Sequence, residues 1–191
     1  MEHHDGPPAL KILRSFPDDG GPPGRAHVED DLERYLNRPY DYSGLKDYGD
    51  DILLLEWDIA VSRVDLGIFA QRVKGSDWPV VAPFLSRGGG NYMHWRVEAT
   101  GPRPIRKGEP DCDLFGFGMA YFPAWTLRDY PPGWGNSSIL SDGSLPRWLQ
   151  TLPQARPVPV DWDITVFAHG KANCHQVNSK PVKLFAVSED K

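Results

Sequence analysis

The chain has 191 residues, of which 40% are hydrophobic and 25% charged, and its formal net charge is −5 at pH 7. This length suits one domain with a full core, and the acidic balance argues against a general electrostatic attraction to nucleic acid. Only two cysteines are present, Cys112 and Cys174, so a disulfide framework is not indicated. No stretch approaches the ~20 apolar residues of a membrane span, and the polar N-terminus is not typical of a signal peptide. We therefore expect a cytoplasmic protein.

The first part of the chain is organised around one apolar stretch. Residues 1–8 are expected to be a flexible tail and residues 9–191 a single domain, which begins with a strand at 9–16 and a short amphipathic helix at 27–37. The stretch 50–61 then reads Asp-Asp-Ile-Leu-Leu-Leu-Glu-Trp-Asp-Ile-Ala-Val. An apolar run without helical periodicity predicts a strand buried on both faces, which is typical of a mostly parallel sheet.

The rest of the chain alternates short strands with short helices. Ser62 and Asp65 form a capping box ahead of a helix predicted over 64–74, and short helices or turns are expected at 123–129 and 145–152. Further strands are predicted at 80–85, 92–99, 112–122, 157–161, 164–169 and 182–187. The segment 102–110 is basic and loop-like. The fold class is therefore α/β: a single-domain mixed sheet, mostly parallel, flanked by helices and joined by long Pro/Gly-rich loops.

Two carboxylates, Glu56 and Asp58, directly follow the apolar run. Acids at the carboxyl end of a central strand lie where open α/β sheets bind their ligands, and the Glu-x-Asp spacing places both on one side of an extended backbone. Such carboxylates repel each other unless a cation lies between them, and a divalent ion with oxygen ligands is the candidate. The alternative is a strand that ends in solvated acids. A second acid pair, Asp161 and Asp163, follows a proline-rich segment and is interpreted as part of a loop.

The order of these features resembles the DxD segment of GT-A-fold glycosyltransferases, in which two acids bind a metal that holds the diphosphate of a sugar nucleotide. Glu56-Trp57-Asp58 would be a variant of that motif. Residues 113–122 resemble the glycine-bearing strand that presents the acceptor, and residues 141–143 resemble the acidic motif that follows it. Residues 165–169 resemble the late strand that ends in a metal-binding histidine. The resemblance spans residues 50–169 and implies a GT-A-like, Rossmann-like fold.

The resemblance implies an enzyme, a hexosyl- or pentosyltransferase that moves a sugar from a nucleotide-sugar donor to an acceptor. Its metal ligands would be Asp58, His169 and Glu56, with His175 competing for the histidine position. Mn²⁺ or Mg²⁺ would be the ion, and a histidine beside carboxylates favours Mn²⁺. The acceptor, whether protein, glycan, lipid or modified base, stays open.

The remaining site residues are assigned by the same resemblance. Asp142 is the candidate catalytic base for the acceptor hydroxyl; the alternative is a helix N-cap or an ordinary Asp-Gly turn. The residues expected to bind the nucleotide sugar are Glu56, Asp58, Arg14 and Lys171. The residues expected to bind the acceptor are Gly116, Gly118 and Trp125.

Other interpretations stay open. A basic group near Trp95 is either a solvated loop or a contact to phosphate or acceptor; it comprises Arg87, Arg96, Arg103, Arg106 and Lys107. The alternative function is a non-catalytic α/β module that binds a carbohydrate or protein partner through Trp-rich loops and has a structural acidic cluster. A metal-dependent phosphoester hydrolase is a third option.

Overall fold

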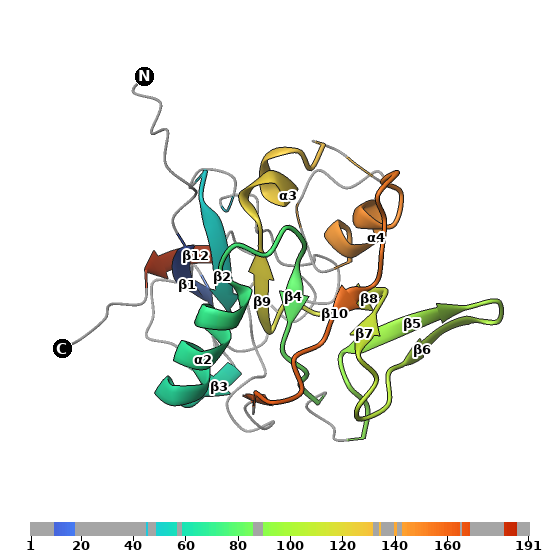
Figure 1. Ribbon diagram of the computed structural model, residues 1–191, viewed down its shortest axis with the longest axis horizontal. Coiled ribbons are helices and arrows are strands. Elements are labelled where there is room, and N and C mark those ends of the chain that lie inside the picture. The colour runs from blue at the N-terminus through green and yellow to red at the C-terminus, as the bar shows by residue number, and fades with distance from the viewer. Residues whose placement is uncertain are drawn as a thin grey trace, which may run out of the picture.

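The computed structural model describes residues 10–17, 45, 49–56, 59–85, 90–131, 134, 140, 143–164, 166–168 and 182–186. Within these residues the fold is α/β, with several small sheets and few helices (Figure 1). The predicted tail at 1–8 and the predicted helix at 27–37 lie outside them. No helix in the described part of the chain is long and apolar enough to cross a membrane.

The main sheet has the order β12-β1-β2-β9-β4 among the described residues. Its strands are β12 (Val182–Ala186), β1 (Leu10–Pro17), β2 (Asp51–Leu55), β9 (Met119–Phe122) and β4 (Val80–Val81). Of its pairings, β1–β2 is parallel, whereas β12–β1, β2–β9 and β9–β4 are antiparallel.

The prediction of a mostly parallel sheet is therefore wrong. The strands β1, β2 and β4 point the same way, but β9 runs in the opposite direction and lies between β2 and β4. All five residues of β2 are buried. A strand buried on both faces has the same continuous apolar run in either kind of sheet, so its composition could not reveal the direction of its neighbours.

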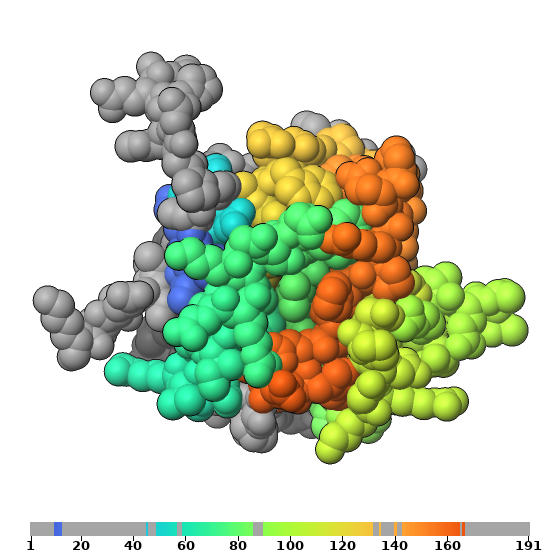
Figure 2. Space-filling view, viewed as in Figure 1, coloured from blue at the N-terminus to red at the C-terminus, as the bar shows by residue number. Residues whose placement is uncertain are grey.

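Three smaller sheets accompany the main one in the described chain. β5 (His94–Glu98) pairs with β6 (Gly101–Pro104) and β8 (Leu114–Phe115), while β7 (Asp111–Cys112) pairs with β10 (Val158–Pro159). β3 (Ile59–Val61) pairs with β11 (Val166–Ala168). The β5–β6 hairpin projects from the body of the molecule (Figures 1 and 2). Its second strand lies in the segment predicted as a loop, and its two prolines are tolerated because β6 is an edge strand.

The helices cover the two faces of the main sheet. α2 (Arg63–Val73) begins as predicted, because the Ser62 Oγ accepts a hydrogen bond from the Asp65 N–H at 3.0 Å. Its buried residues Phe69 and Val73 pack in one apolar cluster with Leu53 and Leu55. α3 (Ala124–Arg128) and α4 (Leu145–Leu149) contribute to the other cluster.

The alternation of side chains along β2 explains this division. Ile52 and Leu54 belong to the cluster with α3 and α4, and Leu53 belongs to the cluster with α2. At the start of the strand, the buried Asp51 carboxylate accepts hydrogen bonds from the Tyr121 hydroxyl at 2.8 Å and from the Ala124 N–H at 2.9 Å. Asp51 therefore ties β2 to β9 and to the first turn of α3, which is a structural role.

Candidate functional site

The chain turns at Glu56, where the sequence predicted a continuous strand. β2 ends at Leu55 and β3 begins at Ile59, and the Ile59 N–H donates to the Glu56 carbonyl at 3.0 Å. The expectation of one strand over residues 50–61 is wrong for this reason. The placement of the Glu56 and Asp58 carboxylates on one side of the chain stays a prediction, because Asp58 lies outside the described residues.

Glu56 is joined to the start of the glycine-bearing strand by two hydrogen bonds. The Glu56 N–H donates to the Gly118 carbonyl at 2.7 Å, and the Gly118 N–H donates to Glu56 Oε2 at 3.0 Å. A hydrogen bond to a charged carboxylate is stronger than one between neutral groups, so it helps to orient the half-buried Glu56 side chain at the end of β2. The fold thus brings together two predicted site residues that are 62 positions apart.

Gly116 and Gly118 both lie against the ring of Phe84. A Cβ atom added to Gly118 would lie 2.2 Å from that ring, and one added to Gly116 would lie 3.2 Å from it. Gly118 also has a φ of 29°, which favours glycine. The missing side chains therefore let the chain approach Phe84 closely as it enters β9. The expected contact of these two glycines with an acceptor stays a prediction.

The pairing of β3 with β11 brings the two segments of the predicted metal site together. In this antiparallel pair Ile59 lies opposite Ala168. Asp58 is the residue before Ile59 in the chain, and His169 is the residue after Ala168. Both of these predicted ligands lie outside the described residues. Within the described residues, no group of three or more His, Cys, Asp or Glu side chains is arranged to hold a metal ion.

The other predicted donor contacts are placed only in part. Arg14 lies opposite Leu55 in the β1–β2 pair, beside the residue that precedes Glu56, and the structure describes its backbone only. Lys171 and His175 lie outside the described residues.

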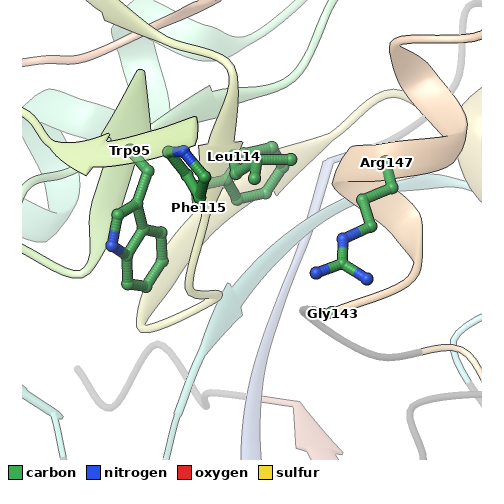
Figure 3. Close-up of a pocket in the computed structure, with 6 residues that line it drawn as sticks. Trp95, Leu114, Phe115, Gly143 and Arg147 are labelled. Atoms are coloured by element: carbon green, nitrogen blue, oxygen red, sulfur yellow. The ribbon is translucent and has the colours of Figure 1, made fainter. Parts of the chain in front are cut away.

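A pocket of about 250 Å³ lies between the β5–β6 hairpin, β8 and α4 (Figure 3). It is lined by Trp95, Pro102, Leu114, Phe115, Gly143 and Arg147. Phe115 is three residues before Gly118, a chain distance of at most ~11 Å, so the pocket lies close to the partner of Glu56. Gly143 is the residue after Asp142, the predicted base, which lies outside the described residues.

Trp125 is not brought together with Glu56. Because β9 runs antiparallel to β2, Trp125 follows the end of β9 that lies beside Ile52, at the far end of the sheet from Gly118. Its indole N–H donates to the Asp77 carbonyl at 3.0 Å, and its ring packs 5.6 Å from that of Trp78. The structure therefore places Trp125 in an aromatic cluster of the core.

Two members of the basic group near Trp95, Arg96 and Arg103, form ion pairs with acids on the β5–β6 hairpin or in the segment that follows it. Arg103 pairs with Glu98 at 2.5 Å and with Glu109 at 3.0 Å, and its hydrogen bond to Glu109 lowers the pKa of that carboxyl. Arg96 pairs with Asp111. These contacts stabilise the hairpin and account for two of the five basic residues without any phosphate. Arg106 and Lys107 are exposed at a turn, and Arg87 lies outside the described residues.

The second acid pair has a structural partner. Arg72 of α2 pairs with Asp161 at 2.9 Å and with Asp163 at 3.1 Å. The hydrogen bond to Asp161 is the main cause of a raised pKa for Arg72. The interpretation of Asp161 and Asp163 as loop residues agrees with this arrangement, in which they fasten the segment after β10 to α2.

Sequence reasoning missed two features of this region. Arg147 lines the pocket from α4, and its place in the short helix after Asp142-Gly143 was a signal that could have identified it. His94 is fully buried on β5 with its ring 5.5 Å from Phe84, and neither ring nitrogen has a hydrogen-bond partner among the described residues. Burial lowers the pKa of His94 to about 3, so the ring is neutral. No sequence signal distinguished this histidine from its neighbours.

Neither the known protein families nor the curated proteins contain a match to this chain. Among solved structures, the chain is similar to the crystal structure of A197 from STIV, with 14% sequence identity and a TM-score of 0.42. The similarity covers 86% of this chain and 78% of that chain. A similarity of this degree carries no argument about fold or function.

Proposed function

We propose that the protein is a metal-dependent glycosyltransferase of GT-A type, which transfers a sugar from a nucleotide-sugar donor to an acceptor. The observation that supports this most strongly is the pairing of β3 with β11, in which Ile59 lies opposite Ala168. Asp58 directly precedes Ile59 in the chain and His169 directly follows Ala168, although Ile59 and Ala168 are 109 positions apart in the sequence. A shared metal site for Asp58 and His169 would require the two segments to lie side by side, and the pairing of β3 with β11 supports the proposal in this respect.

The chemistry of the donor set suits a divalent metal. Glu56 supplies a carboxylate at the end of a buried strand, and its orientation is supported by the Gly118 N–H. Carboxylate oxygens with one imidazole nitrogen suit Mn²⁺. In this proposal Asp58 and His169 would hold the ion with Glu56 nearby, and a divalent metal bound there would supply positive charge to offset that of a departing diphosphate. Arg14 and Lys171 would contact the donor.

The acceptor side of the proposal is supported by the pocket. Phe115 lines it three residues before Gly118, and Gly143 lines it one residue after Asp142. An acceptor hydroxyl at the edge of this pocket would need a base to take its proton. Asp142 is the proposed base. Trp125 is left out of the acceptor site, because its indole is engaged at the other end of the sheet.

The test is calorimetric binding of UDP and GDP with and without Mn²⁺, followed by a sugar-release assay on a panel of nucleotide sugars. The wild type is expected to bind one diphosphate more than about tenfold more tightly with Mn²⁺. Asp58→Asn and His169→Ala are expected to abolish that gain. Glu56→Gln keeps an oxygen that can accept from Gly118 and removes the charge, so it is expected to reduce the gain without unfolding the protein.

Asp163→Asn is the matched control. It belongs to the other acid-x-acid pair, its side chain is 76% exposed, and its partner is Arg72. Its nucleotide binding should equal that of the wild type. Equal affinity of the wild type for both diphosphates with and without Mn²⁺ would refute the transferase proposal.

The second candidate, a non-catalytic carbohydrate-binding module, is favoured by one observation, the pocket with Trp95 in its wall. The two candidates differ in the sugar-release assay. Metal-dependent release of sugar from any donor supports the transferase. No sugar release from any donor, together with sugar binding, supports the module.

A further inference from the structure

We propose that the pocket between Trp95 and Arg147 binds a single sugar-sized ring that carries an anionic group, a carboxylate or a phosphate. Its volume of about 250 Å³ is below the ~300–1,000 Å³ of sites for drug-sized ligands. The pocket therefore has room for one ring and not for a whole nucleotide sugar. Its use as the acceptor subsite rests on the proposed function, whereas binding of the ring does not.

The walls of the pocket supply an apolar surface for the ring. Trp95 comes from β5, Pro102 from β6, and Leu114 with Phe115 from β8. Trp95 is half-buried, so part of its indole face is accessible. Figure 3 shows Trp95 and Arg147 on opposite sides of Leu114 and Phe115. An indole packs well against the C–H face of a sugar while its N–H remains available for a hydrogen bond.

The other side of the pocket supplies one positive charge. Arg147 is exposed, and no carboxylate in the described part of the chain lies within ion-pair distance of its guanidinium. The acids on β7 and next to it are already engaged: Asp111 pairs with Arg96, and Asp113 accepts from the Val97 N–H at 2.8 Å.

A guanidinium pairs bidentately with a carboxylate or a phosphate. The pocket thus offers one apolar wall and one cation that no described acid neutralises. A ring with a single anionic substituent satisfies both, whereas a neutral sugar would use the wall alone.

Ligand-observed NMR titrations with glucose, glucuronate and glucose 6-phosphate test this inference. We expect at least one anionic sugar to bind the wild type about tenfold more tightly than glucose does, the gain from one charge-assisted pair. Arg147→Gln should remove that preference, Arg147→Lys should keep part of it, and Trp95→Ala should weaken all three sugars. Arg106→Gln removes an exposed arginine outside the pocket and should behave like the wild type. The anionic sugar that binds more tightly shows whether the pocket prefers a carboxylate or a phosphate.

The inference is overturned if no sugar binds, if glucose binds as tightly as the anionic sugars, or if the preference survives in Arg147→Gln. Mn²⁺-dependent nucleotide binding, measured on the same proteins, separates this result from the proposed function. Its absence in the wild type would overturn the transferase proposal alone. Its persistence in Arg147→Gln, together with lost preference for the anionic sugar, would support both.

Discussion

The buried His94 predicts an unusual loss of stability in mild acid. Its side chain is fully buried against Phe84, and burial lowers its pKa from 6.5 to about 3. Below pH 6.5 the unfolded chain takes up a proton at His94, whereas the folded chain does not until the pH approaches 3. Protonation therefore favours the unfolded state over this interval, and stability falls as the pH falls. His94→Leu removes the titrating group and keeps the site apolar.

The size of the effect follows from the pKa difference. Each pH unit between the two pKa values is worth about 1.36 kcal/mol, so the two units from pH 6.5 to 4.5 correspond to about 3 kcal/mol. Domains of this kind have a total stability of roughly 5–15 kcal/mol, so the loss is large enough to measure. At pH 7 the variant should be at least as stable as the wild type. Two buried nitrogens without a described partner cost about 1–3 kcal/mol, and the lost ring contact with Phe84 is worth about 0.5–1.5 kcal/mol.

Urea unfolding at pH 7, 5.5 and 4.5 measures both quantities. The free energy of unfolding of the wild type should fall by about 3 kcal/mol more than that of His94→Leu between pH 7 and 4.5. Acidic residues titrate in both proteins, so their contribution cancels in the difference, and equal m-values confirm that the same surface is exposed. Parallel pH profiles for the two proteins would refute the buried, neutral state of His94.

Two further predictions concern contacts around β9. Gly118→Ala should destabilise the protein by about 2–4 kcal/mol, because the new Cβ meets the Phe84 ring at a strained φ. The double variant with Phe84→Ala should lose less free energy of unfolding than the two single variants lose together. Additive losses would contradict the clash. Asp51→Ala should cost about 1–3 kcal/mol, because it leaves the Ala124 N–H without its acceptor and the Tyr121 hydroxyl with the Ser76 carbonyl alone. Asp51→Asn should cost less, and urea midpoints that rank Asn below Ala would contradict this assignment.

Local sequence signals predicted some of the elements correctly. The strand at 9–16 corresponds to β1, and the capping box at Ser62 and Asp65 begins α2 as expected. The apolar residues of α2 at helical spacing include Phe69 and Val73, which are buried. These features depend on residues within a few positions of each other, so their physical causes are present in the sequence itself.

Contacts between distant segments could not be predicted in the same way. The Glu56–Gly118 hydrogen bonds and the pairing of Ile59 with Ala168 depend on which strands become neighbours. Arg96 and Arg103 were interpreted as members of a basic group, because the hairpin that brings them to Glu98, Glu109 and Asp111 was not predicted. The residues next to an arginine in the sequence therefore do not show whether an acid from another segment pairs with it.

One misjudged strand direction explains where the predicted acceptor residues lie. In a parallel pair, β9 would begin beside Asp51, and Trp125, which follows its end, would lie near Glu56. In the observed antiparallel pair, Met119 lies opposite Leu55 and Phe122 lies opposite Ile52. Gly118 is therefore the residue that meets Glu56, and Trp125 is carried along four residues of strand, roughly 13 Å, to the other end. No arrangement of a straight β9 beside β2 could have placed both at Glu56. The antiparallel direction of β9 thus has two consequences. It places Trp125 at the far end of the sheet, and it places Gly118, which follows Phe115 of the pocket wall by three residues, beside Glu56.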